Sequence, residues 1–375
     1  MLQIVIERVL AMSFKFGIGK EIITPPFKTC LSCSKYYDDV YVKTAILNDG
    51  RTYALLISYD LLFHEHYLNI ALKEYAFNKY GIPKDNTIVC YTHSHNSPSS
   101  KGYDSYNASD EYEEFLLERG KNCIDRAFTN IFEGSLHYGI VEGNWNINRR
   151  LNVNGTIDMR PNLDGPRDND IYLLEIRDRN GITRGLLLNY ACHPVHYPAP
   201  TMISSEYPGR LCQILETKYY GATAMFLQGA GANARPRGTA KTGMWKDCSF
   251  EEIDDMANMM SNNVQRKLHS NTMEKVELSL LGTEFIIELP VEVQSLEYFK
   301  KMIENEQIGP LHRKNAIYVV ENYDSIKDSV DLICGILKLS DNLYITHMGG
   351  EPVYEVKKLV EKAIGSKRII FLGYT

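Results

Sequence analysis

Two histidines separated by one residue, His93 and His95, follow directly after a short apolar, β-branched run in the sequence. This run, 87–91, has the composition of a buried β-strand, and Pro98 closes the polar stretch because proline does not fit a central strand. Imidazoles at the end of a buried strand can bind a metal ion or transfer protons. An isolated His-x-His is more often a polar loop without chemistry, so the pair needs support from elsewhere in the chain.

Two further strand-like runs are each followed by a residue that can bind a metal ion. One apolar run is followed by His193 and a proline, and a later one leads through Gly-Gly to Glu351. Two imidazoles and one carboxylate form a known catalytic zinc site with one position left open. Such an ion lowers the pKa of its water to about 7 and polarises a carbonyl group. We therefore predict that His93, His193 and Glu351 bind one zinc ion, although the set also suits iron or manganese, and that His95 is the proton donor or base.

Two polar segments are candidates for contacting a substrate. Segment 143–150 contains a tryptophan, three asparagines and the pair Arg149 and Arg150. Paired arginines are usually solvated, and these neighbours add the alternative of an anion- or carbonyl-binding role. Segment 228–237 follows a strand and is rich in glycine and alanine, so its backbone N–H groups could approach a ligand closely. Its glycine spacing matches neither a P-loop nor a dinucleotide fingerprint.

The elements that must position these residues alternate between strand and helix patterns. This alternation predicts an α/β fold with mixed, largely parallel sheets flanked by helices in a single large domain. Turn sequences at 48–50 and 178–181 indicate two tight hairpins. We expect the domain to cover 13–375, with residues 1–12 as an N-terminal extension or a mis-assigned start.

Composition narrows the class of protein further. The chain has 375 residues and a formal net charge of −6, so nothing indicates a nucleic-acid or anionic-membrane partner. No apolar run reaches membrane-spanning length, and no signal peptide is evident. The eight cysteines are scattered, and Cys30-x-x-Cys33 has no second pair to complete a structural zinc site. We predict a cytoplasmic protein with a small-molecule substrate and no stable membrane insertion; the sequence does not indicate an oligomeric state.

Four motifs together resemble the neutral (non-lysosomal) ceramidases and their shorter bacterial relatives. They are Thr92-His93-Ser94-His95-Asn96-Ser97-Pro98, Asn148-Arg149, Ala191-Cys192-His193 and Gly350-Glu351, and the resemblance extends from about Phe16 to the C terminus. The resemblance implies a zinc-dependent amidohydrolase acting on N-acyl bonds. It also implies zinc ligands at His93, His193 and Glu351, a second active-site histidine at His95 and a substrate-contacting arginine at Arg149.

This chain departs from the family pattern at two places, in the glycine- and alanine-rich segment 228–237, here called the small-residue loop, and near Tyr374. Arg235 stands where the family has a serine, and the family's last zinc-binding tyrosine lies beyond the match to Tyr374. We also expect no C-terminal immunoglobulin-like domain. The predicted catalytic residues are His95, Arg149, Asn233 and Arg235.

These departures set the predicted activity apart from ceramide hydrolysis. We predict cleavage of an amide or ester in a substrate that is more polar than ceramide. The alternative is a catalytically silent relative that binds a metal and a small ligand.

Overall fold

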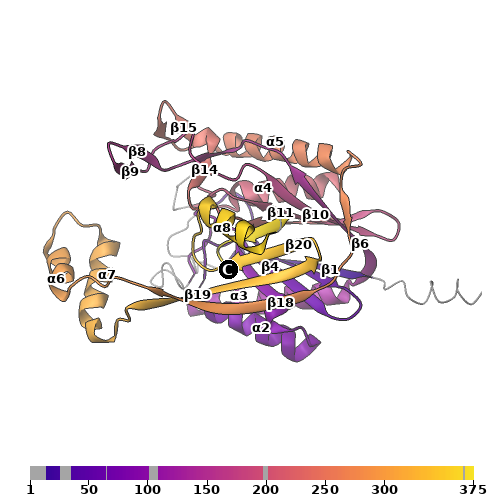
Figure 1. The fold of residues 1–375 in the computed structure, drawn as a ribbon, viewed down its shortest axis with the longest axis horizontal. Helices are drawn as coiled ribbons and strands as arrows, with labels where there is room; N and C mark the ends of the chain where they lie inside the picture. The colour runs from indigo at the N-terminus through magenta and orange to yellow at the C-terminus, as the bar shows by residue number, and fades with distance from the viewer. Residues whose placement is uncertain (1–13, 26–34, 65, 101–108, 197–201, 366–367) are drawn as a thin grey trace, which may run out of the picture. The chain divides into compact units, whose positions relative to one another are not determined.

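The computed structural model describes residues 14–25, 35–64, 66–100, 109–196, 202–365 and 368–375 (Figure 1). The expected N-terminal extension and the Cys30-x-x-Cys33 motif lie outside the described residues. The chain forms two compact units, of which the smaller is Phe285–Cys334 and the larger comprises the rest. The candidate site residues all belong to the larger unit.

The larger unit is built on a nine-stranded sheet in the order β13-β11-β10-β6-β1-β3-β4-β5, with β17 also paired to β6. Its strands are β1 (Lys15–Ile22), β3 (Tyr41–Asn48), β4 (Tyr53–Tyr59), β5 (Thr87–Tyr91), β6 (Phe132–Val141), β10 (Ile171–Asp178), β11 (Thr183–Tyr190), β13 (Thr223–Gln228) and β17 (Glu274–Val276). The predicted mixed sheet flanked by helices is confirmed. The expected excess of parallel pairs is wrong for this sheet, in which six pairings are antiparallel and two, β4–β5 and β11–β13, are parallel.

Tight turns explain the antiparallel majority. β3 and β4 are joined through the turn at Asp49, whose Oδ1 accepts hydrogen bonds from the backbone N–H groups of Arg51 and Thr52. β10 and β11 are joined through Asp178, whose Oδ1 accepts in the same way from Asn180 and Ile182. Such turns connect neighbouring antiparallel strands, whereas parallel neighbours need a longer crossover. The two parallel pairs have helical crossovers, α2 (His66–Tyr80) and α4 (Glu206–Lys218).

Helices cover the sheet in two pairs. α2 packs with α3 (Asp110–Thr129), and α4 packs with α5 (Phe250–Leu268), on opposite sides of the larger unit in Figure 1. The first pair buries leucines such as Leu72 and Leu116 against strands β3, β4 and β5. The second pair buries Leu211 and Met260 against β10, β11 and β13. Both halves of the main sheet are therefore supported close to the strands that lead to the predicted ligands.

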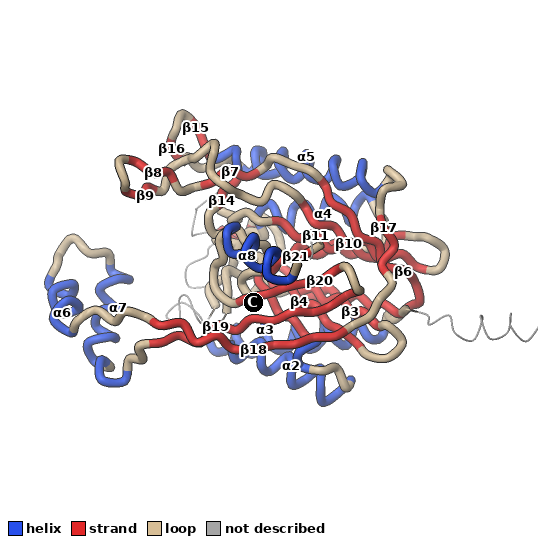
Figure 2. Tube along the Cα trace, in the orientation of Figure 1, coloured by secondary structure: helices blue, strands red, loops and turns tan. Residues whose placement is uncertain are grey.

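A second, four-stranded sheet lies against the main sheet. Its strands, in sheet order, are β18 (Leu281–Pro290), β19 (Ser329–Ser340), β20 (Leu343–Met348) and β21 (Ile369–Leu372). Leu337, Ile345 and Leu372 share one apolar core with residues of the main sheet. The crossover helix α8 (Tyr354–Ile364) packs Val356 on Phe371 of β21 (Figure 2). This arrangement fixes the segment that carries Glu351.

The remaining elements are short. They are β2 (Lys35–Tyr36), β7 (Asn146–Asn148), β8 (Leu151–Val153), β9 (Thr156–Asp158), β12 (Met202–Ile203), β14 (Ala234–Pro236), β15 (Ala240–Lys241) and β16 (Met244–Trp245). The smaller unit contributes α6 (Leu296–Glu304) and α7 (Pro310–Glu321), together with the adjoining ends of β18 and β19. Of these elements, β7 and β14 matter most for the site, because they pair with each other beside the small-residue loop.

The two ends of the main sheet approach each other, although β5 and β13 are the terminal strands in its order. The hydroxyl of Ser58 in β4 donates a 2.7 Å hydrogen bond to the carbonyl of Phe226 in β13. The buried amide of Asn189 in β11 donates to the carbonyls of Leu227 and Phe371. The carboxyl ends of β5, β11, β13 and β21 are thereby brought to one place, which the strand order alone does not reveal.

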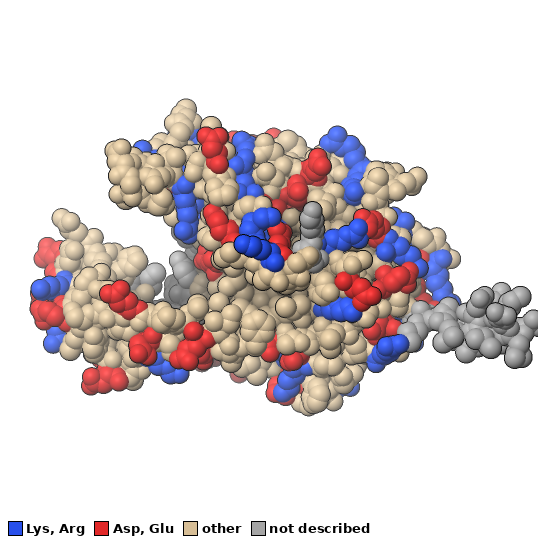
Figure 3. Space-filling model, viewed as in Figure 1, with Lys and Arg blue, Asp and Glu red and all other residues tan. Residues whose placement is uncertain are grey.

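In the face drawn in Figure 3, the Lys and Arg side chains are interspersed with Asp and Glu. Among the residues that the structure describes, no helix has the length and apolar character needed to cross a membrane.

Strand β1 meets helix α3 at two glycines, Gly17 and Gly19. A Cβ atom at Gly19 would lie 2.1 Å from the carbonyl oxygen of Cys123, far inside van der Waals contact with a rigid backbone atom. Gly19→Ala should therefore lower the free energy of unfolding by about 3 kcal/mol, the upper end of overpacking costs, as measured by chemical denaturation. Gly238→Ala is the matched control, because its nearest neighbour is an ordinary 3.6 Å contact. Equal effects of the two substitutions would contradict the packing argument.

Candidate metal centre

His93 is held in position by the backbone that follows β5. Its φ of 64° is in the left-handed region, which costs a non-glycine residue roughly 1–2 kcal/mol. Main-chain hydrogen bonds from Thr92 to Tyr59 and from His93 to Leu61, each 2.9 Å, stabilise this conformation. Backbone strain of this kind occurs at functional sites, where the surrounding structure must hold it in place.

The tautomer of His93 follows from its hydrogen bonding. Nδ1 lies 2.8 Å from the carbonyl oxygen of Leu62, and since a carbonyl only accepts, Nδ1 carries the proton. Nε2 of a neutral ring then presents a lone pair. Within the described part of the chain this Nε2 is buried without a hydrogen-bond partner, and the nearest charged atom is Oε1 of Glu351 at 3.5 Å.

His193 has the same arrangement at the end of β11. Its Nδ1 donates to the carbonyl of Gly231 at 2.8 Å, and its backbone N–H donates to Ala234 at 3.1 Å. Nε2 faces Oε2 of Glu351 at 3.0 Å and Nη2 of Arg149 at 3.3 Å. Burial lowers the pKa of the His193 imidazole, and the nearby Arg149 lowers it further, which favours the neutral ring.

His95 lies beside this pair but is open to solvent. One ring nitrogen of His95, one of His93 and one of His193 all lie within 4.8 Å of one another, and His95 is the exposed member of the three. The backbone N–H of His95 donates to Pro194 at 3.4 Å, which ties the two histidine loops together. Although the side chain is accessible at the edge of the centre, the surrounding protein removes part of the hydration of its ring, and this desolvation, followed by His193, lowers the pKa of His95 to about 4.

Glu351 enters the centre from the turn before α8. Its two oxygens lie 3.5 Å from Nε2 of His93 and 3.0 Å from Nε2 of His193, and Arg149 lies 3.9 Å away. Partial burial raises the pKa of Glu351, but the contact with Nε2 of His193 and the charge of Arg149 outweigh burial, and the pKa is lowered to about 2. The carboxylate is therefore ionised at neutral pH.

These residues fit a divalent cation. A carboxylate oxygen and the lone pair of a neutral imidazole are both acceptors, and at 3.0 Å they repel each other unless a proton or a cation lies between them. The unpartnered Nε2 of His93 points to the same place. His93 and His193 belong to two possible ligand sets, completed by Glu351 or by His95. Neutral imidazoles and a carboxylate are the ligands that zinc and its neighbouring divalent ions accept.

Arg149 links the centre to the small-residue loop. Its backbone N–H donates to Asn233 at 2.8 Å, and its Nε donates to the carbonyl of Ala232 at 2.7 Å. Nη2 of Arg149 lies 3.3 Å from Nε2 of His193 and 3.9 Å from Oε2 of Glu351. The neighbouring Arg150 is exposed and donates its backbone N–H to Asn148. Only the first arginine of the pair faces the centre.

Arg235 is partly buried on strand β14 without a carboxylate partner. The charge of Asp247 acts on Arg235 without a direct ion pair between the two, and the buried Nε of Arg235 has no hydrogen-bond partner among the described residues. Nη2 donates to the carbonyl of Val195 at 3.1 Å, and the guanidinium lies 4.9 Å from the ring centre of Trp245. Burial lowers the pKa of Arg235, and the positive charge of Arg149 lowers it further.

Asn233 is placed differently from the other predicted catalytic residues. Its Nδ2 donates to Oε2 of Glu355 at 3.1 Å and to the carbonyl of Pro166 at 3.2 Å, and its Oδ1 accepts from the N–H of Tyr354. These contacts bind the loop to the first turn of α8. The structure therefore gives Asn233 the geometry of a residue that holds the Glu351 segment in place.

Sequence reasoning gave Tyr374 too little weight. Tyr374 received no firm role, yet its ring lies 4.3 Å from that of His93, and its backbone N–H donates to Gly350. The only signal was its place directly after a strand.

Fold and site together define a mixed α/β protein in which the ends of separate strands meet at a histidine-carboxylate cluster. No model of a known protein family matches the chain, and no curated protein matches it. Solved structures do. The neutral ceramidase from Pseudomonas aeruginosa superposes with a TM-score of 0.72 at 15% identity, covering 97% of this chain and 67% of that one. A structure of a ceramidase complexed with C2 gives 0.71 at 14% identity, covering 97% and 68%. The resemblance stated from the sequence motifs is thus confirmed at the level of the fold.

Proposed function

We propose that this chain is a divalent-metal-dependent hydrolase that cleaves an amide or ester bond of a polar acyl substrate. The observation that carries the proposal is the meeting of two imidazole Nε2 atoms with the Glu351 carboxylate at 3.0 and 3.5 Å. The structural similarity to solved ceramidases supports a hydrolase. We propose zinc as the ion, held by His93, His193 and Glu351.

The protein groups have separate tasks in this proposal. A bound divalent ion supplies Lewis acidity toward the substrate carbonyl and a water nucleophile at neutral pH. Hydrolysis adds the oxygen of water to the acyl carbon, breaks the bond to nitrogen or oxygen, and places a proton on the leaving group. His95, exposed at the edge of the centre, is the group in position to carry that proton. Arg149 holds His193 and can donate to an oxygen of the substrate.

The substrate class follows from Arg235. A guanidinium that is partly desolvated and has no carboxylate partner among the described residues is stabilised by an anionic or hydroxyl-rich ligand. A lipid tail in the same place would leave the charge unpaired. We therefore propose a substrate that carries a carboxylate, phosphate or sugar group and not a long-chain ceramide.

The free thiols fit a cytoplasmic location, which we also propose. The six described cysteines without a disulfide partner are all buried. Buried free thiols are typical of proteins from a reducing compartment.

Metal analysis combined with a hydrolysis panel tests the proposed function. The purified protein should contain about one divalent ion per chain, and it should hydrolyse at least one member of a panel of polar N-acyl compounds and esters. Chelation should abolish the activity, and re-addition of zinc should restore it. Bound metal without turnover across the panel would instead favour a metal- and ligand-binding protein, and the absence of bound metal would refute both alternatives.

Replacing Arg235 with serine tests the substrate class. Arg235→Ser should lower turnover of an anionic acyl substrate by about tenfold or more, since a charge-assisted hydrogen bond is worth roughly 1.5–3 kcal/mol. Hydrolysis of a long-chain ceramide should be negligible in the natural protein and should be sought in the variant. Arg237→Ser is the control, because Arg237 is half-buried like Arg235 but its guanidinium already hydrogen-bonds to the backbone and side-chain oxygens of Asn144. Robust ceramide hydrolysis by the natural protein would contradict the proposed class.

A further inference from the structure

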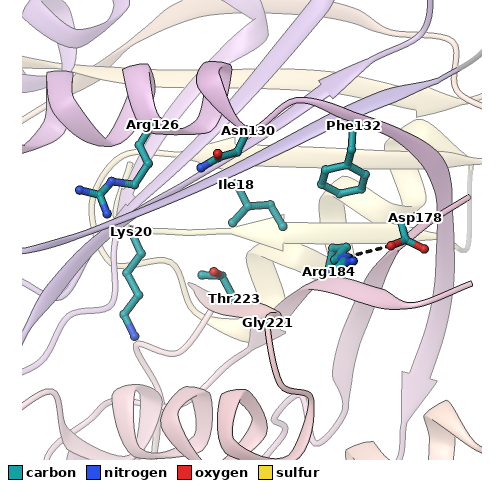
Figure 4. Close-up of a pocket in the computed structure, with 9 residues that line it drawn as sticks. All are labelled: Ile18, Lys20, Arg126, Asn130, Phe132, Asp178, Arg184, Gly221 and Thr223. Atoms are coloured by element: carbon teal, nitrogen blue, oxygen red, sulfur yellow. Dashed lines mark hydrogen bonds and ion pairs between the residues drawn. The ribbon is translucent and has the colours of Figure 1, made fainter. Parts of the chain in front are cut away.

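A cavity lies near the starts of strands β11 and β13, whereas the metal centre lies beyond the ends of these strands. Its volume is about 470 Å³, and three cations, Lys20, Arg126 and Arg184, line it (Figure 4). Ile18 and Phe132 supply apolar surface, and Asp178 is the single carboxylate among the lining residues. A cavity of this size can hold a small molecule, and its charged lining would select an anion.

The position of this cavity separates it from the proposed chemistry. Arg184 is the second residue of β11, whereas His193 follows the end of that strand. A strand rises by about 3.3 Å per residue, which places Arg184 roughly 20 Å from the end of β11 that precedes His193. Thr223, at the start of β13, also lines the cavity. A ligand here would therefore not touch the metal centre.

Lys20 is paired with Glu216, and this carboxylate has a second hydrogen-bond donor. Its Nζ lies 2.6 Å from Oε2 of Glu216 and 4.0 Å from the ring centre of Tyr41. The other oxygen of Glu216 accepts a 3.0 Å hydrogen bond from the backbone N–H of Ala224. If Lys20 turned toward a ligand, the Glu216 carboxylate would keep this donor.

Arg184 is also paired with a carboxylate that has other hydrogen-bond donors. Its Nε donates to Oδ2 of Asp178 at 2.9 Å (Figure 4). Oδ1 of Asp178 already accepts from the backbone N–H groups of Asn180 and Ile182 at 2.8 and 3.0 Å. The turn therefore satisfies this carboxylate whether or not Arg184 remains bound to it.

Arg126 shares its carboxylate with a second arginine. Nη2 of Arg126 lies 2.5 Å from Oε1 of Glu21, and Nη1 of Arg119 lies 3.0 Å from Oε2. Arg126 is the more exposed of the two arginines, with 58% of its side chain accessible. Arg119 can hold Glu21 alone while Arg126 faces the cavity.

We propose that this cavity is a binding site for a small polyanion bearing phosphoryl groups. All three cations can turn to a ligand without leaving a carboxylate that lacks a hydrogen-bond donor. The side chains of Lys20, Arg184 and Arg126 are 25%, 39% and 58% accessible, so solvent partly screens their ion pairs. Guanidinium groups bind phosphoryl oxygens with two parallel hydrogen bonds, and lysine adds a point charge. The apolar patch of Ile18 and Phe132 would accommodate an organic portion of the ligand.

Calorimetric titration with inorganic pyrophosphate at low ionic strength tests the proposal. The natural protein should bind one pyrophosphate, and Lys20→Gln/Arg184→Gln should bind it at least about tenfold more weakly, since loss of one charge-assisted contact already approaches that factor. The matched control is Lys84→Gln/Arg160→Gln. It removes two cations of similar ion pairs, with Glu74 and Asp158, outside the cavity, and its affinity should stay within about twofold of the natural value.

Two further variants keep the test decisive. Arg126→Gln removes the most exposed of the three cations and should weaken binding even if the double variant fails to fold. His193→Ala removes a proposed metal ligand and should leave pyrophosphate binding unchanged. Failure of the natural protein to bind, equal losses in the cavity and control variants, or loss of binding only in His193→Ala would each overturn the proposal. In the last case the anion would be bound at the metal centre.

Discussion

Replacing His193 with alanine should remove the bound metal, with affinity lowered by more than about 100-fold. Loss of an orienting group outside the ligand set already costs 10–100-fold in metal affinity, so loss of a ligand should cost more. The Nε2 lone pair of His193 is directed into the centre by the hydrogen bond from Nδ1 to Gly231, and no other described imidazole can replace it from that strand. Metal content per chain, measured after dialysis against a buffer of fixed free zinc, gives the result.

His137→Ala is the control for this measurement. His137 is a half-buried histidine on β6 whose Nε2 contacts the hydroxyl of Ser135, remote in sequence from the candidate ligands. It should keep the full metal content. An unchanged metal content in His193→Ala would refute the proposed centre. A loss in both variants would show that binding depends on the stability of the fold and not on the ligands.

Replacing His95 with alanine should lower turnover by about 10²–10⁴-fold while the metal is retained, the range expected for a general acid or base. The expectation rests on the difference between His95 and its two neighbours. His93 and His193 are buried with main-chain carbonyls on Nδ1, whereas His95 is exposed. Turnover and metal content should be measured on the same sample.

The same variant distinguishes the two possible ligand sets. If the metal is lost with His95, the three imidazoles form the ligand set, and Glu351 becomes the group to test for proton transfer. Glu351→Gln is the companion variant, because it keeps the shape of the side chain and removes the charge. Full activity of His95→Ala would contradict any role of this residue in proton transfer.

The chemistry of the site could be predicted from the sequence because it is local. A β-branched run that leads to His93, and an apolar, leucine-rich run that leads to His193, can be read directly, as can the Gly-Gly turn before Glu351. What brings the three together is not local. The hydrogen bond from Ser58 to Phe226 joins strands that are far apart in the sheet order.

The direction of the strands was harder to predict for a related reason. The turns at Asp49 and Asp178 were recognised as hairpins, but the alternation of strands and helices favoured parallel pairing overall. The role of Asn233 also depends on α8, which lies more than one hundred residues further along the chain. Residue type shows that an amide can donate hydrogen bonds, and only the fold shows which acceptor it finds.

The proton positions on His93 and His193 are set by main-chain carbonyls, those of Leu62 and Gly231. Every residue type carries a carbonyl, so substitutions at these two positions need not disturb the tautomers as long as the backbone path is kept. In evolutionary terms, the orientation of the two imidazoles is encoded in the topology and not in any neighbouring side chain. A centre of this construction can tolerate extensive sequence drift, and the fold of this chain resembles that of a solved ceramidase although only 15% of the residues are identical.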